Sequence, residues 1–307
     1  MKRLNFIDTA KGICMLLIIL GHCVGQTDIR YNSFLITWIY SFHTTTFFIV
    51  TGMLMEHIKE YERPFAKSII SNAKRLLIPY FVFQILYSIW YCVMNGFSNI
   101  KWLLSDILLL VGWNYASWFL LALFIAKILT LTIYKTTKKK PIIYLLMITM
   151  FLIALLLCKL ELNTPLYWIY QQGLRGLLGL GFIFIGIIFY HYKEYLNKTN
   201  ILIVSLCISL ISSFANSIVS IFFLEIGNPF LYVISAISGA IFILSLSHYI
   251  KNRFITFFSD ESITAMGTHQ LILWSFPFKS ILLWFVVTPL TALAMYIVRI
   301  IKQHMNH

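Results

Sequence analysis

The sequence predicts an all-α protein, a polytopic bundle of about ten membrane-spanning helices folded as a single domain over residues 1–307. The amino-acid composition carries this prediction. Of the 307 residues, 60% are hydrophobic and only 11% are charged, whereas soluble domains average about 45–50% apolar and about 25% charged residues. No polar stretch between the apolar segments is long enough to fold alone. We therefore expect the chain to lie within a lipid bilayer.

Each predicted span is a run of about 20 mostly apolar residues, the length that crosses the hydrocarbon core of a bilayer. Lys2 and Arg3 precede the first run as in a signal peptide, but no small-residue cleavage site follows, so a retained helix is expected. The predicted spans are 5–26, 33–55, 77–95, 115–134, 141–159, 172–192, 200–224, 229–250, 262–276 and 278–301.

Two further segments are expected at the membrane surface rather than across it. Residues 100–112 are apolar but too short to span, which predicts an external interfacial or re-entrant helix. Residues 56–76 alternate charged and apolar side chains, which predicts an amphipathic helix on the inner surface with a break near Pro64. Neither segment counts among the spans.

The placement of basic residues predicts the orientation of the chain. The formal net charge is +13, which in a soluble protein would suggest a nucleic-acid partner. Here most lysines and arginines fall in the loops that a cytoplasmic N-terminus would place inside, so the positive-inside rule accounts for the charge. Both termini and the lysine-rich loop at 135–140 are therefore expected in the cytoplasm, and no nucleic-acid binding is expected.

Cysteine usage indicates neither a disulfide framework nor a metal centre. The five cysteines are odd in number and lie in or beside apolar runs, without the spacing of metal ligands. We expect small core residues, no metal site and no bound cofactor.

The first span carries three ionisable side chains, which are functional candidates because burying them in a membrane is costly. Lys11 and His22 are eleven residues apart, so they share one helix face about 16 Å apart along the axis. Asp8 lies one turn below Lys11 and is placed to pair with it. The structural alternative is a lysine that extends to the inner interface and a histidine that fills a polar gap between helices.

Five more residues are candidates for binding. His43 lies in the second span, His269 at the head of the ninth, and Arg175 inside or at the outer edge of the sixth. A buried arginine needs an anion or a water-filled cavity. Lys74 and Arg75 begin the third span, where they would contact anionic lipids or attract a phosphate-bearing ligand.

Several short motifs are distributed along nearly the whole chain. They are FIDTAKGI at 6–13, LGH at 20–22, SFH at 41–43, TG at 51–52, KRLLIPY at 74–80, WFL at 118–120 and GTH at 267–269. In this order they resemble the acyltransferase-3 family of membrane O-acyltransferases, in particular its fucose-4-O-acetylase-like branch. Lys11 stands where many members have arginine, and Thr51 where serine is usual.

The resemblance implies an enzyme that transfers an acyl group, usually acetyl from acetyl-CoA, to a hydroxyl of an envelope or exported glycan. It implies a multi-pass protein of a bacterial cytoplasmic membrane, with acyl-CoA as co-substrate. His22 would act as general base on the acceptor hydroxyl, either directly or through an acyl-histidine intermediate. Lys11 and Asp8 would serve the donor end of the same helix.

The remaining candidates would bind the two substrates. Lys74 and Arg75 would lie near the phosphates of acyl-CoA. His43, Arg175 or His269 would orient the acceptor or stabilise the tetrahedral oxyanion.

Two other classes of function stay open. A transporter or exporter of a polysaccharide or glycan intermediate would favour two halves related by an inverted repeat, and the sequence shows none. A membrane sensor or scaffold would have no cavity that joins Lys11 to His22. The sequence leaves the acceptor, the acyl group and the oligomeric state undefined.

Overall fold

The computed structural model describes residues 3–24, 34–97, 116–160, 167–217, 219–278 and 280–305. Over these ranges the chain is helical, without a strand, and residues 220 and 225 form an isolated bridge. The all-α prediction is therefore confirmed for the described part of the chain. The surface helix expected at 100–112 lies outside the described residues.

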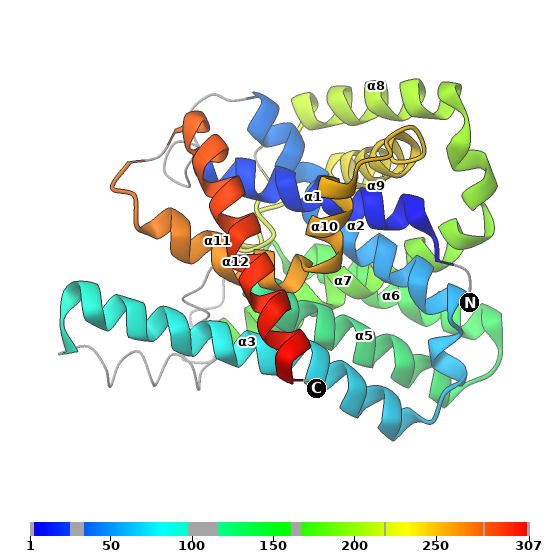
Figure 1. Ribbon diagram of the computed structural model, residues 1–307. Coiled ribbons are helices and arrows are strands. Elements are labelled where there is room, and N and C mark those ends of the chain that lie inside the picture. The colour runs from blue at the N-terminus through cyan, green and yellow to red at the C-terminus, as the bar shows by residue number, and fades with distance from the viewer. Residues whose placement is uncertain are drawn as a thin grey trace. The chain divides into compact units, whose positions relative to one another are not determined.

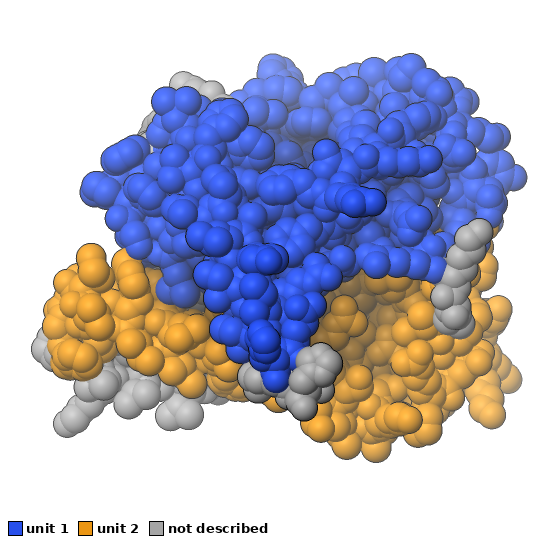
Figure 2. All heavy atoms as spheres, viewed as in Figure 1, with its two compact units in different colours: residues 1–47, 192–219, 226–307 blue, residues 48–191, 220–225 orange. Residues whose placement is uncertain are grey.

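The chain divides into two compact units, coloured separately in Figure 2. Unit 1 comprises residues 1–47, 192–219 and 226–307, and unit 2 comprises residues 48–191 and 220–225. Helix α2, Phe34–His57, contributes its first part to unit 1 and its second part to unit 2.

Unit 1 is organised around α1, Asn5–Val24. The other helices of this unit are α8 Thr199–Ala215, α9 Pro229–Leu246, α10 Arg253–Asp260, α11 Ser262–Trp274 and α12 Trp284–Met305, with short 3-10 turns at Lys193–Asn197 and Ile281–Leu283. Helix α1 contacts α9, α10, α11 and α12, and α8 lies beside α9 (Figure 1). Gly12 allows the closest of these approaches, because a Cβ at this position would overlap the Ile255 carbonyl oxygen of α10.

Unit 2 is organised around α7, Tyr167–His191. Its other elements are the 3-10 turn Glu60–Glu62, α3 Phe65–Asn95, α5 Trp118–Thr136 and α6 Lys140–Leu157. Helix α7 packs against α5 and α6, and α3 packs against α5. Long apolar side chains on α3 and α6 face outward, as expected for helices that contact lipid.

Eight helices among the described residues are long and apolar enough to cross a membrane. They are α1, α2, α3, α5, α6, α7, α9 and the segment Ile281–His304. Two of the expected spans are shorter: α8 has 17 residues and α11 has 13. At 1.5 Å per residue these helices measure about 25 Å and about 20 Å, less than the roughly 30 Å of a hydrocarbon core.

One expected boundary is wrong, for a local reason. The seventh span was expected to continue to residue 224, but α8 ends at Ala215. There the Asn216 side chain donates to the Ile226 carbonyl and accepts from the Asn228 backbone N–H, which fixes a turn. The break expected near Pro64 is present, because α3 begins at Phe65 directly after it, and α3 then runs unbroken through Pro79, as membrane helices can.

Candidate functional site

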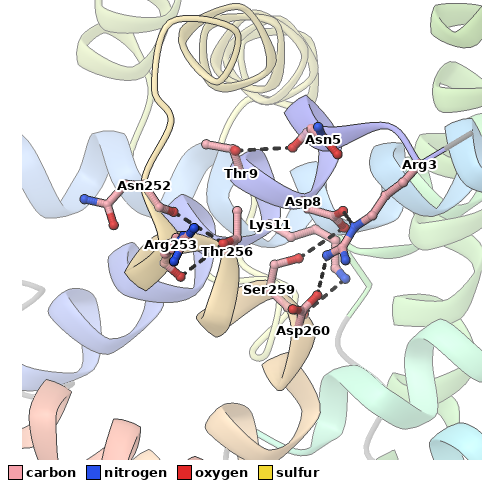
Figure 3. Close-up of polar contacts among 10 residues, drawn as sticks. All are labelled: Arg3, Asn5, Asp8, Thr9, Lys11, Asn252, Arg253, Thr256, Ser259 and Asp260. Atoms are coloured by element: carbon pink, nitrogen blue, oxygen red, sulfur yellow. Dashed lines mark hydrogen bonds and ion pairs between the residues drawn. The ribbon is translucent and has the colours of Figure 1, made fainter.

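The N-terminal end of α1 carries a network of charged groups (Figure 3). Arg3 forms ion pairs with Asp8 and with Asp260 of α10. The hydrogen bond and charge of Asp8, followed by those of Asp260, raise the pKa of Arg3 above its ordinary value. Lys11 Nζ donates to the Ser259 carbonyl oxygen over 3.3 Å. Asp8, expected to pair with Lys11, has its ion pair with Arg3 and accepts from the Ser259 hydroxyl over 3.4 Å.

The other end of α1 carries a cluster of two histidines and a glutamine. His22 Nδ1 lies 2.9 Å from His269 Nε2 and 2.7 Å from Gln270 Nε2. The two imidazole rings are stacked, with centroids 5.1 Å apart and planes inclined by 14°. His22 is half-buried and His269 is fully buried. The structure therefore brings together two residues that lie 247 positions apart in the sequence.

The partners of this cluster determine the tautomer of neutral His269 and allow two protonation states of His22 Nδ1. His269 Nδ1 is 2.7 Å from the Ala265 carbonyl, which can only accept, so this nitrogen carries a proton. In neutral His269 the lone pair is then on Nε2, which accepts when His22 Nδ1 is protonated. Trp274 Nε1 donates to Gln270 Oε1 over 2.8 Å and thereby turns the amide NH₂ toward His22. His22 Nδ1 therefore has an acceptor when it is protonated and a donor when it is not.

Two side chains of α2, Tyr40 and His43, lie beside this cluster. The Tyr40 ring lies edge-on to His22, with centroids 6.4 Å apart, and the His43 ring lies 4.9 Å from that of Tyr40. A Cβ on Gly21 would lie 2.6 Å from the Tyr40 ring, so glycine is required for this approach. The Tyr40 hydroxyl is buried without a hydrogen-bond partner among the described residues. His43 Nδ1 is 2.7 Å from its own helix carbonyl at Ile39.

Three consecutive helices hold α1 along its length. Helix α10 contacts it near Lys11, and α11 contacts it at His22. Between these points, Trp284 Nε1 of α12 donates to the Leu16 carbonyl over 3.1 Å. Lys11 and His22 thus both face the α10–α11 segment, as expected for residues on one helix face.

The other candidate cations, Lys74, Arg75 and Arg175, lie in unit 2. Arg175 is fully buried, donates to Gln171 Oε1 over 2.9 Å and to the Phe222 carbonyl, and stacks on the Phe222 ring at 4.7 Å. Its Nε and Nη1 have no hydrogen-bond partner in the described part of the chain. Lys74 and Arg75 are exposed on α3, open to anionic lipids or to a charged ligand.

A buried carboxylate cluster in unit 2 was not expected from the sequence. Glu56 and Glu60, assigned to a surface helix by their pattern, are 4% and 6% exposed. Lys127 Nζ lies 3.0 Å from Glu60 Oε2, and Asn72 donates to Glu60 Oε1 over 2.8 Å. Glu56 pairs with Lys59, three residues further along the chain, and its Oε1 lies 3.3 Å from His191 Nε2 of α7. No signal in the sequence identified these long-range partners.

Sequence reasoning also missed Gln270 and Tyr40. Gln270 had a signal, because it is a polar residue beside His269 in an apolar run, whereas Tyr40 had none. No group of three or more metal-ligating side chains occurs among the described residues. The imidazoles of the His22 cluster can take part in proton transfer.

Comparisons with known proteins give one match. Residues 4–301 match the family model Acyl_transf_3, described as an acyltransferase domain. This range extends over both units and includes all eight of the residues proposed from the sequence. Comparisons with curated proteins and with solved structures gave no significant match.

Proposed function

Because the chain belongs to the acyltransferase family whose model it matches over residues 4–301, we propose that it O-acylates a glycan. The acyl group is acetyl, the donor is acetyl-CoA, and the acceptor is a hydroxyl of an envelope or exported glycan. The family match and the eight apolar helices establish the broader class, a membrane acyltransferase. The observation that best supports the specific reaction is the cluster of His22, His269 and Gln270.

In this proposal His22 is the general base. The Gln270 amide, which donates to the unprotonated Nδ1, gives way when Nδ1 is protonated and donates to His269 Nε2. The Nε2 lone pair of His22 then takes the proton of the acceptor hydroxyl. The positive charge that develops on His22 is stabilised because His269 accepts from its Nδ1–H. His269 is thus a positioning residue, in the role that an aspartate has in other histidine-based transferases and hydrolases.

Acyl transfer then proceeds through a tetrahedral intermediate. The acceptor oxygen forms a bond to the thioester carbonyl carbon, and the carbonyl electrons move onto the oxygen. The tetrahedral oxyanion then collapses, the C–S bond breaks, and the proton on His22 passes to the departing thiolate of CoA. The buried Tyr40 hydroxyl, without a partner among the described residues, is placed to donate to the oxyanion.

The charged end of α1 serves the donor. Lys11, held by the Ser259 carbonyl, contributes a positive charge on the same face as His22. Asp8 acts indirectly, because it fixes Arg3 and Ser259 beside Lys11. Lys74 and Arg75, exposed on α3, would attract anionic acyl-CoA to the protein surface.

His43 and Arg175 are proposed to serve the acceptor. His43 packs against Tyr40 and thereby helps to set the position of its hydroxyl. The two unpartnered N–H groups of Arg175 are suited to hydroxyl, carboxylate or phosphate oxygens of a glycan carrier. The placement of the chain in the fucose-4-O-acetylase-like branch also belongs to this proposal.

The proposed membrane topology is about ten crossings in a bacterial cytoplasmic membrane, with both termini in the cytoplasm. It supposes that α8 and α11 cross the membrane as shorter helices, alongside neighbours that can cover their ends. Single cysteines at positions 138 and 304 of a cysteine-free variant would report the orientation. Labelling of the two positions from opposite sides of the membrane would contradict it.

The proposed reaction is tested with purified protein, radiolabelled acetyl-CoA and a panel of glycans and lipid-linked glycans. Label in the glycan, lost on mild alkaline treatment, is the expected result for an O-ester. If no acceptor takes up label while vesicles containing the protein move a glycan across the membrane, the transporter alternative replaces this proposal.

A further inference from the structure

We infer that a cavity at the N-terminal end of α1 binds the phosphates of the donor nucleotide, the adenosine part of acyl-CoA. This inference rests on the proposed function, because it names the site for the donor of that reaction. The cavity has a volume of about 710 Å³ and is lined entirely by residues of unit 1. Binding cavities for small organic ligands commonly measure about 300–1,000 Å³.

The charge of the lining is positive. Arg3, Lys251 and Arg253 line the cavity, and no aspartate or glutamate is among the lining residues. Arg3 is occupied by Asp8 and Asp260. Lys251 and Arg253 have no ion-pair partner among the described residues. Two unneutralised cations beside a cavity attract a multiply charged anion such as a phosphate ester.

The lining of the cavity also includes an aromatic pair, Phe6 and His248. The His248 ring is stacked on Phe6, with centroids 4.4 Å apart and planes inclined by 15°. A stacked pair of this kind can extend its stack to a purine ring.

Two helices begin at the cavity, α1 at Asn5 and α10 at Arg253. The partial positive charge of a helix N-terminus favours bound anions. At α10 the first N–H groups are already taken by the Asn252 side chain. The helix ends therefore add a favourable field, while the side chains provide the contacts.

The position of the cavity fits a donor whose reactive end reaches His22. Thr9 lines the cavity, and thirteen residues separate it from His22. On a helix this corresponds to about 20 Å. Coenzyme A carries its thiol on a long flexible arm, away from its phosphates, so one molecule can occupy both places. A free phosphate or a lipid headgroup would occupy only the first.

The test measures CoA binding to purified full-length protein in nanodiscs of neutral lipid. We expect Lys251→Ala/Arg253→Ala to weaken CoA binding about tenfold to hundredfold, as the loss of charge-assisted hydrogen bonds predicts. The wild type should also prefer CoA over 3′-dephospho-CoA, and the double variant should lose that preference. Arg299→Ala is the matched control, because it removes an exposed cation of unit 1 that does not line the cavity. The affinity of Arg299→Ala for CoA should equal that of the wild type.

The outcomes separate this inference from the proposed function. Unchanged CoA affinity in the double variant, with intact acyl transfer, overturns the cavity and leaves the function standing. Loss of binding in Arg75→Ala alone would place the phosphates in unit 2 and equally overturn the inference. Parallel nanodiscs that contain anionic lipid test the lipid source: if the double variant differs from the wild type only there, the cavity is a headgroup site and the inference is overturned. A wild type that neither binds CoA nor transfers acyl groups contradicts the proposed function itself.

Discussion

Two buried polar clusters among the described residues, one in each unit, differ in how their charges are compensated. In unit 2, Glu60 is paired with Lys127 and also accepts from Asn72, so its two oxygens have partners within the protein. In unit 1, His22 and His269 need no counter-ion when neutral, and their contacts orient one ring nitrogen of His22. The first arrangement fixes charges, whereas the second provides His22 Nδ1 with a partner in either protonation state.

This difference distinguishes a cluster suited to stabilising the fold from a cluster suited to taking part in a reaction. A buried ion pair with further hydrogen bonds holds its charges in one state, because either charge alone would be poorly solvated. An imidazole titrates near neutral pH and can exist in two tautomers, so its protonation can change during a reaction. We therefore expect substitutions in the carboxylate cluster to reduce folding stability, and substitutions in the histidine cluster to reduce turnover.

The largest effect is expected for His22→Ala. Loss of a general base typically slows a reaction about 10²–10⁴-fold, so transfer of labelled acetyl should fall below detection. Binding of CoA and thermal stability in detergent should remain at wild-type levels, because His22 is half-buried and outside the donor cavity. Transfer at the wild-type rate would show that His22 is not the base.

The next effect is expected for Lys127→Met, which leaves Glu60 without its cation. Both side chains are nearly buried, at 11% and 8% exposure, and removal of one partner from such a pair costs about 3–5 kcal/mol. Thermal unfolding in detergent should show the loss, while acyl transfer per folded molecule stays unchanged. The double variant Lys127→Met/Glu60→Gln removes both charges and should recover much of the stability. A double variant no better than the single one would show that the charges were not responsible.

A smaller effect is expected at Lys11, where two substitutions distinguish the role of the positive charge from that of the side-chain shape. Lys11→Ala removes the cation beside Ser259 and should lower kcat/KM for acetyl-CoA about tenfold to hundredfold, since hydrogen bonds to charged groups contribute about 1.5–3 kcal/mol. Lys11→Arg retains the charge and should keep part of the activity. Equal activities of the two variants would contradict a charge-based role.

The smallest effect is expected at His269, which acts through His22. His269→Ala should slow transfer about tenfold, because the protonated His22 loses an acceptor worth about 1.5 kcal/mol, the low end for hydrogen bonds to charged groups. His269→Gln can still accept from His22 Nδ1 and should restore part of the rate. Because both variants replace a buried ring, a purely structural role would leave them equally impaired.

The sequence predicted the parts of the site that lie on one helix. Helical periodicity places Lys11 and His22 on one face of α1 without any tertiary information, and the structure has both facing α10 and α11. It could not predict that His269 rather than His43 contacts His22. That contact depends on how α11 packs against α1, which residue spacing does not encode.

The fold was predictable to a similar degree. Apolar length located nearly all of the helices, because burial in lipid requires it. It misjudged the segment after Ala215, where two asparagine side chains form a turn inside an apolar run. The charge pattern likewise placed Glu56 and Glu60 on the membrane surface. This prediction is wrong because partners from distant helices allow the two side chains to be buried.

If the cavity binds the donor phosphates as proposed, the three contacts along α1 limit which donors can react. Gly12 against α10, Leu16 against α12 and His22 against α11 leave α1 little freedom to slide or rotate. A helix rises by a constant 1.5 Å per residue, so the distance along α1 between Thr9 and His22 is fixed at about 20 Å. Donors would be selected by the length between their phosphates and their thioester, and a shortened analogue would bind well yet fail to deliver its acyl group.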